Sequence, residues 1–79
     1  MLSQLENSPK VVGAKQTRRA LNEGKAKRVF LARNADPAVT APMEALCAEH
    51  FVDIEWVDTM KQLGQACGIA VGSAVAALL

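Results

Sequence analysis

The sequence predicts an α/β protein: a three-layer α/β/α sandwich with helices on both sides of a four-stranded mixed sheet. Segments of helical and strand character alternate along the chain, which favours helices packed around a largely parallel sheet. The chain has 79 residues, enough for one domain with one core. Hydrophobic residues make up 51% of it, mostly alanine, valine and leucine, whose small side chains suit helices packed tightly on a sheet.

The first part of the chain predicts two helices separated by a very short strand. A helical turn is expected over Leu2–Glu6, because a Ser-Pro pair then interrupts it. Lys10–Val12 has strand character, and Gly13 separates it from a helix over Ala14–Glu23. Gly24 provides a left-handed stop for that helix.

The middle of the chain predicts a buried strand followed by a helix. Arg28–Ala32 is the clearest buried strand, since it is β-branched and apolar. The segment Arg33–Pro37 is typical of a turn, with an aspartate that caps and a proline that presets φ. We expect the next helix to begin near Thr40 or Pro42 and to end at His50.

The last part of the chain predicts two strands with a helix between them. Asp53–Val57 is the third strand. Thr59 and the glutamine three residues later form a capping box, which opens a helix through Ala66 with Gly68 as its stop. Ser73–Leu79 is a nearly continuous apolar run and is expected to be buried on both faces.

The net charge of +1 conceals a strong asymmetry. The segment 10–33 holds eight cations against the single anion Glu23, a formal charge of +7. The segment 34–58 holds six anions and no lysine or arginine. Such a distribution makes one pole of the molecule attractive to polyanions, whereas the alternative is an ordinary solvated helix face.

The cysteine content argues against a disulfide scaffold, a metal site and a thiol enzyme. Cys47 and Cys67 form no CxxC pair, and His50 is the only histidine, so we expect two reduced, buried thiols. Cys47 and His50 are three residues apart and could share a helix face, but the acidic surroundings would raise the pKa of the thiol. Asp53 and Glu55 are expected on one strand face as a solvated edge.

No other motif indicates catalysis or a cofactor. Glycines recur every four residues from Gly64 to Gly72, but they match neither a P-loop nor a dinucleotide fingerprint. The first ten residues lack a signal-peptide pattern, and the apolar stretch Ile69–Leu79 is too short for a bilayer span. We therefore expect a cytoplasmic protein without enzyme activity, metal, cofactor, membrane or small-molecule substrate.

The start of the second helix is the most informative segment. Gly13 stands at a strand-to-helix junction, and Lys15, Gln16 and Arg19 follow on one exposed face of the helix. A helix N-terminus carries partial positive charge and free N–H groups, which favour phosphate. Lysine and glutamine side chains can hydrogen-bond to base edges, and arginine suits phosphate. The segment is therefore a candidate RNA-binding surface, with a plain basic helix face as the alternative.

Four separated stretches, in this order, resemble one known family. GAKQTRRAL, RVFLARNADP, LCAEH and MKQLGQACGIAVGSAVAAL look like the L7Ae/L30e superfamily of ribosomal and kink-turn RNA-binding proteins, in particular its short bacterial members. The resemblance spans about Lys10 to Leu79. It implies an α/β/α sandwich in which residues 1–79 form a single RNA-binding domain, and a monomer that stabilises kink-turns in ribosomal RNA or riboswitch-like RNA.

The resemblance also implies specific RNA contacts. Gly13 and Ala14 would allow close approach of the backbone, and Lys15 and Gln16 would contact the sheared G·A pairs. Further contacts are implied for Arg19 near phosphate or base, for Arg33 and Lys61 on backbone phosphates, and for the loop residues Ile69, Ala70 and Val71 on extruded nucleotides.

The sequence departs from the family pattern at two points. Archaeal ribosomal members have Asn-Glu where this chain has Lys15-Gln16, which affects base selectivity. Ala70 stands where short bacterial members often have glutamate, which affects how much the loop contributes to RNA binding. The natural RNA and any association with the ribosome are left open.

The competing interpretation is a protein-interaction module, in which a surface of small apolar residues binds a partner. That surface would consist of Ala70, Val71, Ala74 and Ala76.

Overall fold

The computed structural model describes residues 3–79 of the chain. Its elements follow the order that the alternating sequence predicts. They are α1 (Ser3–Asn7), β1 (Lys10–Val12), α2 (Ala14–Asn22), β2 (Arg28–Ala32), α3 (Pro37–Glu49), β3 (Ile54–Val57), α4 (Met60–Ala66) and β4 (Val75–Leu78). The predicted first turn is confirmed as α1, although its proposed first residue, Leu2, lies outside the described residues.

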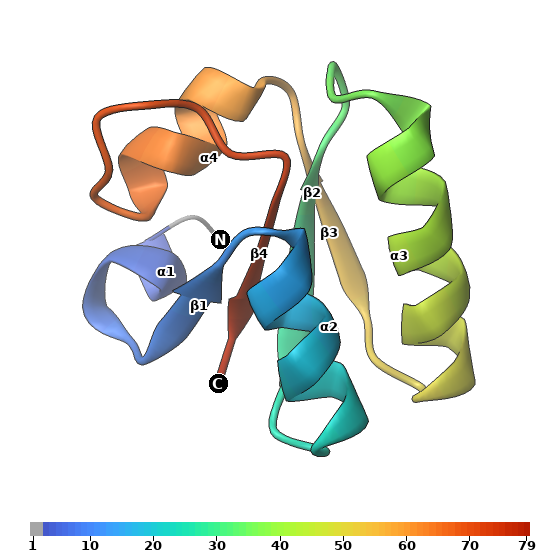
Figure 1. Ribbon diagram of the computed structural model, residues 1–79. Helices are drawn as coiled ribbons and strands as arrows, with labels where there is room; N and C mark the ends of the chain where they lie inside the picture. The colour runs from blue at the N-terminus through green and yellow to red at the C-terminus, as the bar shows by residue number, and fades with distance from the viewer. Residues whose placement is uncertain (1–2) are drawn as a thin grey trace.

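The four strands form one mixed sheet in the order β1-β4-β2-β3 (Figure 1). β2 pairs with β3 in parallel, whereas β4 is antiparallel to both of its neighbours, β1 and β2. The mixed sheet is confirmed, but the expectation of largely parallel pairing is wrong. The segment between β3 and β4 does not cross to the opposite edge of the sheet, as a parallel connection would require. β4 therefore begins at the edge where β3 ends.

The helices form two layers, one on each face of the sheet (Figure 1). On one face, α1 and α4 cover a core cluster that includes Leu5, Phe30 and Leu63. On the other face, α2 and α3 cover a second cluster that includes Leu21 and Met43. Side chains alternate between the two clusters along the central strands, as the two-residue period of a strand requires. The three-layer sandwich is therefore confirmed.

The central strands are buried on both faces, as their apolar sequences predict. Val29 and Leu31 face the α2–α3 layer, whereas Phe30 faces the α1–α4 layer. β4 shows the same alternation and is buried at Val75, Ala76 and Ala77. β4 is shorter than the predicted Ser73–Leu79, and β3 begins at Ile54 rather than Asp53.

Helix α3 begins earlier than the sequence analysis placed it. It starts at Pro37, not at Thr40 or Pro42, and Asp36 is its N-cap. The Asp36 side chain accepts a hydrogen bond from the Ala38 N–H at 2.9 Å, and proline is well tolerated in the first helical turn. The Asp-Pro pair that indicates a turn therefore serves here as a helix start.

Helices α2 and α4 agree closely with the sequence patterns. Thr17, Ala20 and Leu21 form the buried side of α2, and Gly24 follows with a φ of +71°. In α4 the Thr59 hydroxyl oxygen accepts a hydrogen bond from the Gln62 N–H at 3.1 Å, as the capping box predicts.

Candidate nucleic-acid interface

The sheet topology gathers four chain segments at one edge. β1, β2 and β3 run in the same direction and β4 runs in the opposite one. The residues that follow the first three strands and those that precede β4 therefore lie at the same edge; in Figure 1 the turn after β2, α4 and the loop before β4 are uppermost, and α2 begins below them. We call this the upper edge; it comprises Gly13 with the start of α2, the turn Arg33–Asn34, the segment Asp58–Lys61 and the loop Ile69–Ala74.

Helix α2 starts at the upper edge with an open N-terminus. Gly13 precedes the helix with a φ of +99°, a conformation that only glycine adopts readily. Its N–H donates a 2.8 Å hydrogen bond to the Val75 carbonyl oxygen, which fixes the helix start to β4. No side chain of the described residues caps the helix, and its first turn holds no acidic residue. A Cβ atom placed on Gly13 would meet nothing within 4 Å. The positive end of the helix therefore faces open space.

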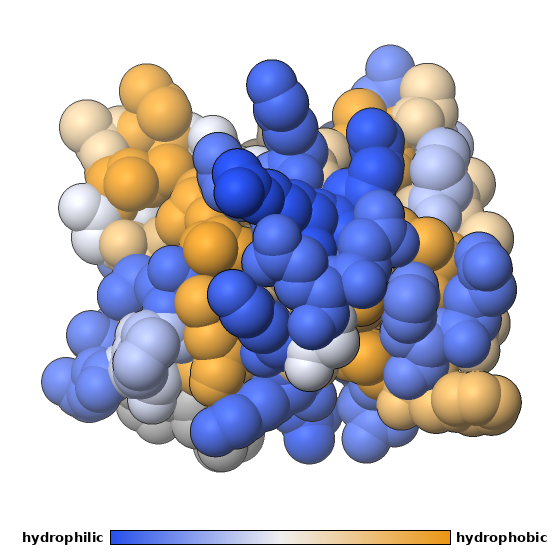
Figure 2. Space-filling model, turned by 60° about the horizontal axis from the view of Figure 1, so that its bottom comes forward, coloured by the Kyte–Doolittle hydropathy of each residue, from blue (hydrophilic) through white to orange (hydrophobic). Residues whose placement is uncertain are grey.

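The polar face of α2 continues this surface. Lys15, Gln16 and Arg18 are exposed, whereas Thr17 between them is fully buried. Hydrophilic side chains gather over α2 at the centre of the face seen in Figure 2. Neither Lys15 nor Arg18 forms an ion pair with any residue in 3–79, so both charges are available to an external anion.

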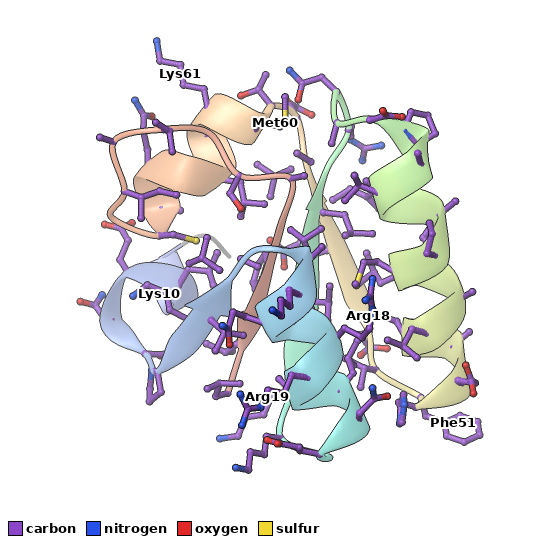
Figure 3. All side chains as sticks on the ribbon, viewed as in Figure 1. Lys10, Arg18, Arg19, Phe51, Met60 and Lys61 are labelled. Atoms are coloured by element: carbon purple, nitrogen blue, oxygen red, sulfur yellow. The ribbon has the colours of Figure 1, made fainter. Side chains whose placement is uncertain are left out.

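Arg19 lies on the exposed surface of α2, one helical turn after Lys15. Its side chain is labelled towards the lower end of the helix in Figure 3, far from Lys61 at the upper edge. The Arg19 Nε atom lies 3.3 Å from Oε2 of Glu23, and the Lys25 Nζ atom lies 3.3 Å from Oε1 of the same carboxylate. The hydrogen bond from Arg19, and then that from Lys25, holds the pKa of Glu23 below its usual range. Arg19 thus neighbours Lys15 along the helix, but its side chain is engaged by Glu23.

The two flanking cations predicted from the sequence both lie at the upper edge. Arg33 directly follows β2, where its Nε atom lies 3.5 Å from an Asp58 carboxylate oxygen and its guanidinium lies 5.9 Å from the centre of the Trp56 ring. Lys61, in the first turn of α4, is exposed. The start of α4 is fixed to the turn after β2 by Asn34, whose side-chain oxygen accepts a 2.8 Å hydrogen bond from the Met60 N–H.

The apolar loop before β4 completes the upper edge. Ala70 is exposed and Val71 is 71% exposed, whereas Ile69 is half-buried against the core. The loop lies directly against α4. It is so close that a Cβ atom on Gly64 would collide with the Val71 carbonyl oxygen. The Ser73 N–H also donates a 3.0 Å hydrogen bond to the Met60 carbonyl oxygen.

The sequence analysis did not assign a role to the two glycines that make this packing possible. Gly64 lies under the Val71 carbonyl, and a Cβ atom on Gly72 would lie 3.1 Å from Cβ of Met60. Their spacing of eight residues matches no phosphate-binding motif. The signal that could have identified them is their position, since they lie on either side of an apolar loop that must fold back on its own helix.

The structure does not support the predicted apolar partner surface. Ala70 and Val71 are exposed, but Ala74 is only partly exposed and Ala76 is fully buried inside β4. Helices cover both faces of the sheet around Ala76, so these residues do not form one accessible patch.

The other candidate groups lie apart from each other. Cys47 is fully buried while His50 is an exposed residue just past α3, so the two do not share a face. Burial, and then the charge of Glu44, raises the pKa of the Cys47 thiol, and burial raises that of Cys67. Asp53 lies outside β3, so it shares no strand face with Glu55, which pairs with Arg28 at 3.7 Å. Both cysteines are free and buried, as expected.

Within residues 3–79, no group of histidine, cysteine, aspartate or glutamate side chains could hold a metal ion. In the same part of the chain, none of the helices combines the length and the apolar character that crossing a bilayer requires.

Comparison with known proteins identifies the class of protein to which this fold belongs. The profile of the ribosomal protein L7Ae/L30e/S12e/Gadd45 family matches residues 2–79, and the chain belongs to that family. It is 46% identical over 69 residues to the RNA-binding protein YbxF of Geobacillus stearothermophilus, an alignment that covers 87% of this chain and 84% of YbxF. An RNA-binding protein of Bacillus pumilus is 48% identical over the same share of both chains.

A solved structure agrees with this assignment. The Giardia lamblia 15.5kD RNA binding protein superimposes with a TM-score of 0.91 and 26% sequence identity. The superposition covers 98% of this chain and 68% of the Giardia protein.

Proposed function

We propose that this protein binds RNA through the upper edge of its sheet, and that its ligand is a kink-turn. One observation carries the proposal: the open N-terminus of α2, the cations Lys15, Arg33 and Lys61, and the apolar loop Ile69–Val71 lie at the same edge. Relatives that are 46% and 48% identical are named RNA-binding proteins. The resemblance of the sequence to kink-turn-binding proteins supports the narrower choice of ligand.

The proposed mechanism is electrostatic and geometric. A sharp bend in an RNA duplex brings phosphates close together, and cations at the protein surface offset their repulsion. The N-terminus of α2 then stabilises the kinked population over the extended one, because only the kinked form opens a groove wide enough for side chains.

Individual residues have distinct roles in this proposal. Gly13 lets the RNA approach the backbone, since no side chain projects there. Lys15 and Gln16 contact the edges of the sheared G·A pairs, and Arg33 and Lys61 contact phosphates. The exposed side chains of Ala70 and Val71 cover bases that leave the stack. The protein acts as a non-catalytic cytoplasmic monomer on ribosomal or riboswitch-like RNA.

A gel-shift titration tests the proposal directly. The protein is titrated against a kink-turn RNA, and against the same RNA in which the tandem G·A pairs are replaced by Watson–Crick pairs. We expect binding to the first RNA and a loss of at least tenfold for the second, about 1.4 kcal/mol, because the straight duplex presents no widened groove. Equal affinity for the two RNAs would contradict the assignment of a kink-turn ligand.

A further inference from the structure

Glu23 holds an unusual position in the charge pattern. It is the only anion in the segment 10–33, among eight cations. Its carboxylate is bound by two of them, with Arg19 Nε at 3.3 Å from one oxygen and Lys25 Nζ at 3.3 Å from the other. The backbone fixes this arrangement, because the Glu23 N–H donates to the Arg19 carbonyl and the Lys25 N–H to the Ala20 carbonyl.

The three side chains line a shallow depression of about 260 Å³ beside α2. Gln16 lines the same depression. The depression is therefore continuous with the proposed RNA site, to which Gln16 belongs. From Gln16 to Glu23 the helix rises about 10 Å. The depression therefore extends the cationic surface away from the helix N-terminus.

We propose that this depression is a second phosphate-binding site, and that Glu23 occupies it when RNA is absent. The carboxylate of Glu23 stands where an RNA phosphodiester would be bound by Arg19 and Lys25. Arginine and lysine bind phosphate through the same charge-assisted hydrogen bonds that they make to a carboxylate. The inference rests on the proposed RNA-binding function and adds to it a contact surface and a competing internal anion.

The three side chains are exposed enough for a phosphate to replace the Glu23 carboxylate. The side chains of Arg19 and Glu23 are 74% and 41% exposed, and that of Lys25 is 68% exposed. Ion pairs with this much solvent contact contribute little to stability, so displacing the carboxylate costs the fold little. Glu23 then lowers RNA affinity without being needed for folding.

The substitution Glu23→Gln removes the competing charge and keeps the size of the side chain. We expect it to tighten binding to a kink-turn RNA by roughly three- to tenfold, because Arg19 and Lys25 no longer need to be released. Glu49→Gln is the matched control: it makes the same charge change on an exposed residue at the end of α3, which does not line the depression. The control should change the affinity by less than about twofold, because its charge is screened at that distance.

A variant without the two cations tests whether Glu23→Gln acts by freeing Arg19 and Lys25 or only by making the protein more positive. In a protein carrying Arg19→Gln and Lys25→Gln, the further change Glu23→Gln should tighten binding no more than Glu49→Gln does. Equal effects of Glu23→Gln and Glu49→Gln in the wild-type background would overturn the second site. Wild-type protein that fails to prefer the kink-turn over the straight duplex would instead refute the proposed function, so the two failures are distinguishable.

Discussion

Lys15 and Arg19 are exposed on the same helix, yet they differ in their surroundings. Lys15 lies in the first turn of α2 beside the open helix terminus, and no ion pair within residues 3–79 engages it. Arg19, one helical turn further along, is bound to Glu23. The two side chains should therefore contribute differently to RNA binding.

The substitution Lys15→Ala tests the first of these positions. We expect it to weaken binding to a kink-turn RNA by about 1–3 kcal/mol, as for other base or phosphate contacts. Arg19→Ala should cost less, because Arg19 must first leave Glu23. Lys10→Ala is a matched control, since Lys10 lies on β1 on the side of α1 in Figure 3. Gel-shift titration gives the affinities, and similar losses for Lys15→Ala and Lys10→Ala would contradict a localised site.

The two cysteines predict a dependence of stability on alkaline pH. Burial raises the pKa of both thiols above their usual value of 9.0. A raised pKa means that the folded protein retains its protons longer than the unfolded chain does, so their contribution is complete below pH 9 and is lost as pH rises above it. Urea denaturation at pH 8 and pH 10 should show a lower midpoint at pH 10.

The control is the variant Cys47→Ala with Cys67→Ala, which should lose less stability between the two pH values. A loss equal to that of the wild type would show that other groups cause the whole effect. Native protein at pH 8 should also react with iodoacetamide more slowly than urea-unfolded protein, because both thiols are buried.

At the scale of elements, α3 shows how one polar side chain determines where a helix begins. Asp36 lies outside the helix and accepts a hydrogen bond from the Ala38 N–H, which otherwise has no partner in the first turn. Pro37 is compatible with this position, since it lacks an N–H that would need a partner. The helix therefore gains its first turn from a sequence that also suits a simple turn.

The substitution Asp36→Ala should destabilise the protein by about 1 kcal/mol, the usual loss for an N-cap. Asp53→Ala removes the same charge from an exposed residue outside the strand and should change stability by less than about 0.5 kcal/mol. Chemical denaturation measures both. Equal losses would argue against the helix start at Pro37.

The second element-scale feature is the contact between α4 and the loop that leads into β4. Gly64 allows the loop to lie directly on the helix, with the Val71 carbonyl where a side chain would begin. This contact sets the position of the exposed Val71 side chain. The proposed apolar contact to RNA therefore depends on a glycine that would not touch the RNA.

The substitution Gly64→Ala should destabilise the protein by about 1–3 kcal/mol, because the new methyl group must displace backbone atoms. It should also weaken RNA binding in the protein that remains folded, since the loop shifts. Cys47→Ala is the control: it removes part of a fully buried side chain of α3, which belongs neither to the upper edge nor to the depression beside α2. It should lower the denaturation midpoint while leaving the affinity of the folded protein unchanged. An unaltered affinity in Gly64→Ala would contradict the loop's role.

At the scale of the whole molecule, the charge segregation predicts strong salt dependence. The segment 10–33 carries +7, and its sequence forms β1, α2, β2 and the turn after β2. Each phosphate that a cation neutralises releases counterions, so affinity falls linearly with the logarithm of salt concentration. With three cations at the upper edge, the slope should be about −2 to −3. Titrations between low and moderate salt measure it, and a flat response would contradict phosphate contacts.

The distribution of opposite charge also determines how RNA approaches. The anionic segment 34–58 forms α3, which lies beside α2 on one face of the sheet, and β3, which is the edge strand opposite β1. A protein with one cationic and one anionic region orients in the field of a polyanion before contact. The arrangement therefore favours approach with α2 towards the RNA.

The sequence by itself determined the order of the elements, the buried strand Arg28–Ala32 and the exposed face of α2. These features are local: periodicity, capping residues and glycine positions act over a few neighbouring residues. The sequence also predicted the free, buried cysteines. It misplaced the start of α3, because an aspartate followed by proline is compatible both with a turn and with a helix N-terminus.

Only the tertiary structure decided which of the candidate residues lie together. The reversed direction of β4 brings the loop Ile69–Ala74 to the same edge as Gly13, Arg33 and Lys61, and no local pattern contains that direction. The structure also revealed that Arg19 is bound to Glu23, the C-cap residue of α2. The physical reason is that strand pairing and side-chain contacts join residues distant in sequence, and their geometry depends on how all the elements pack.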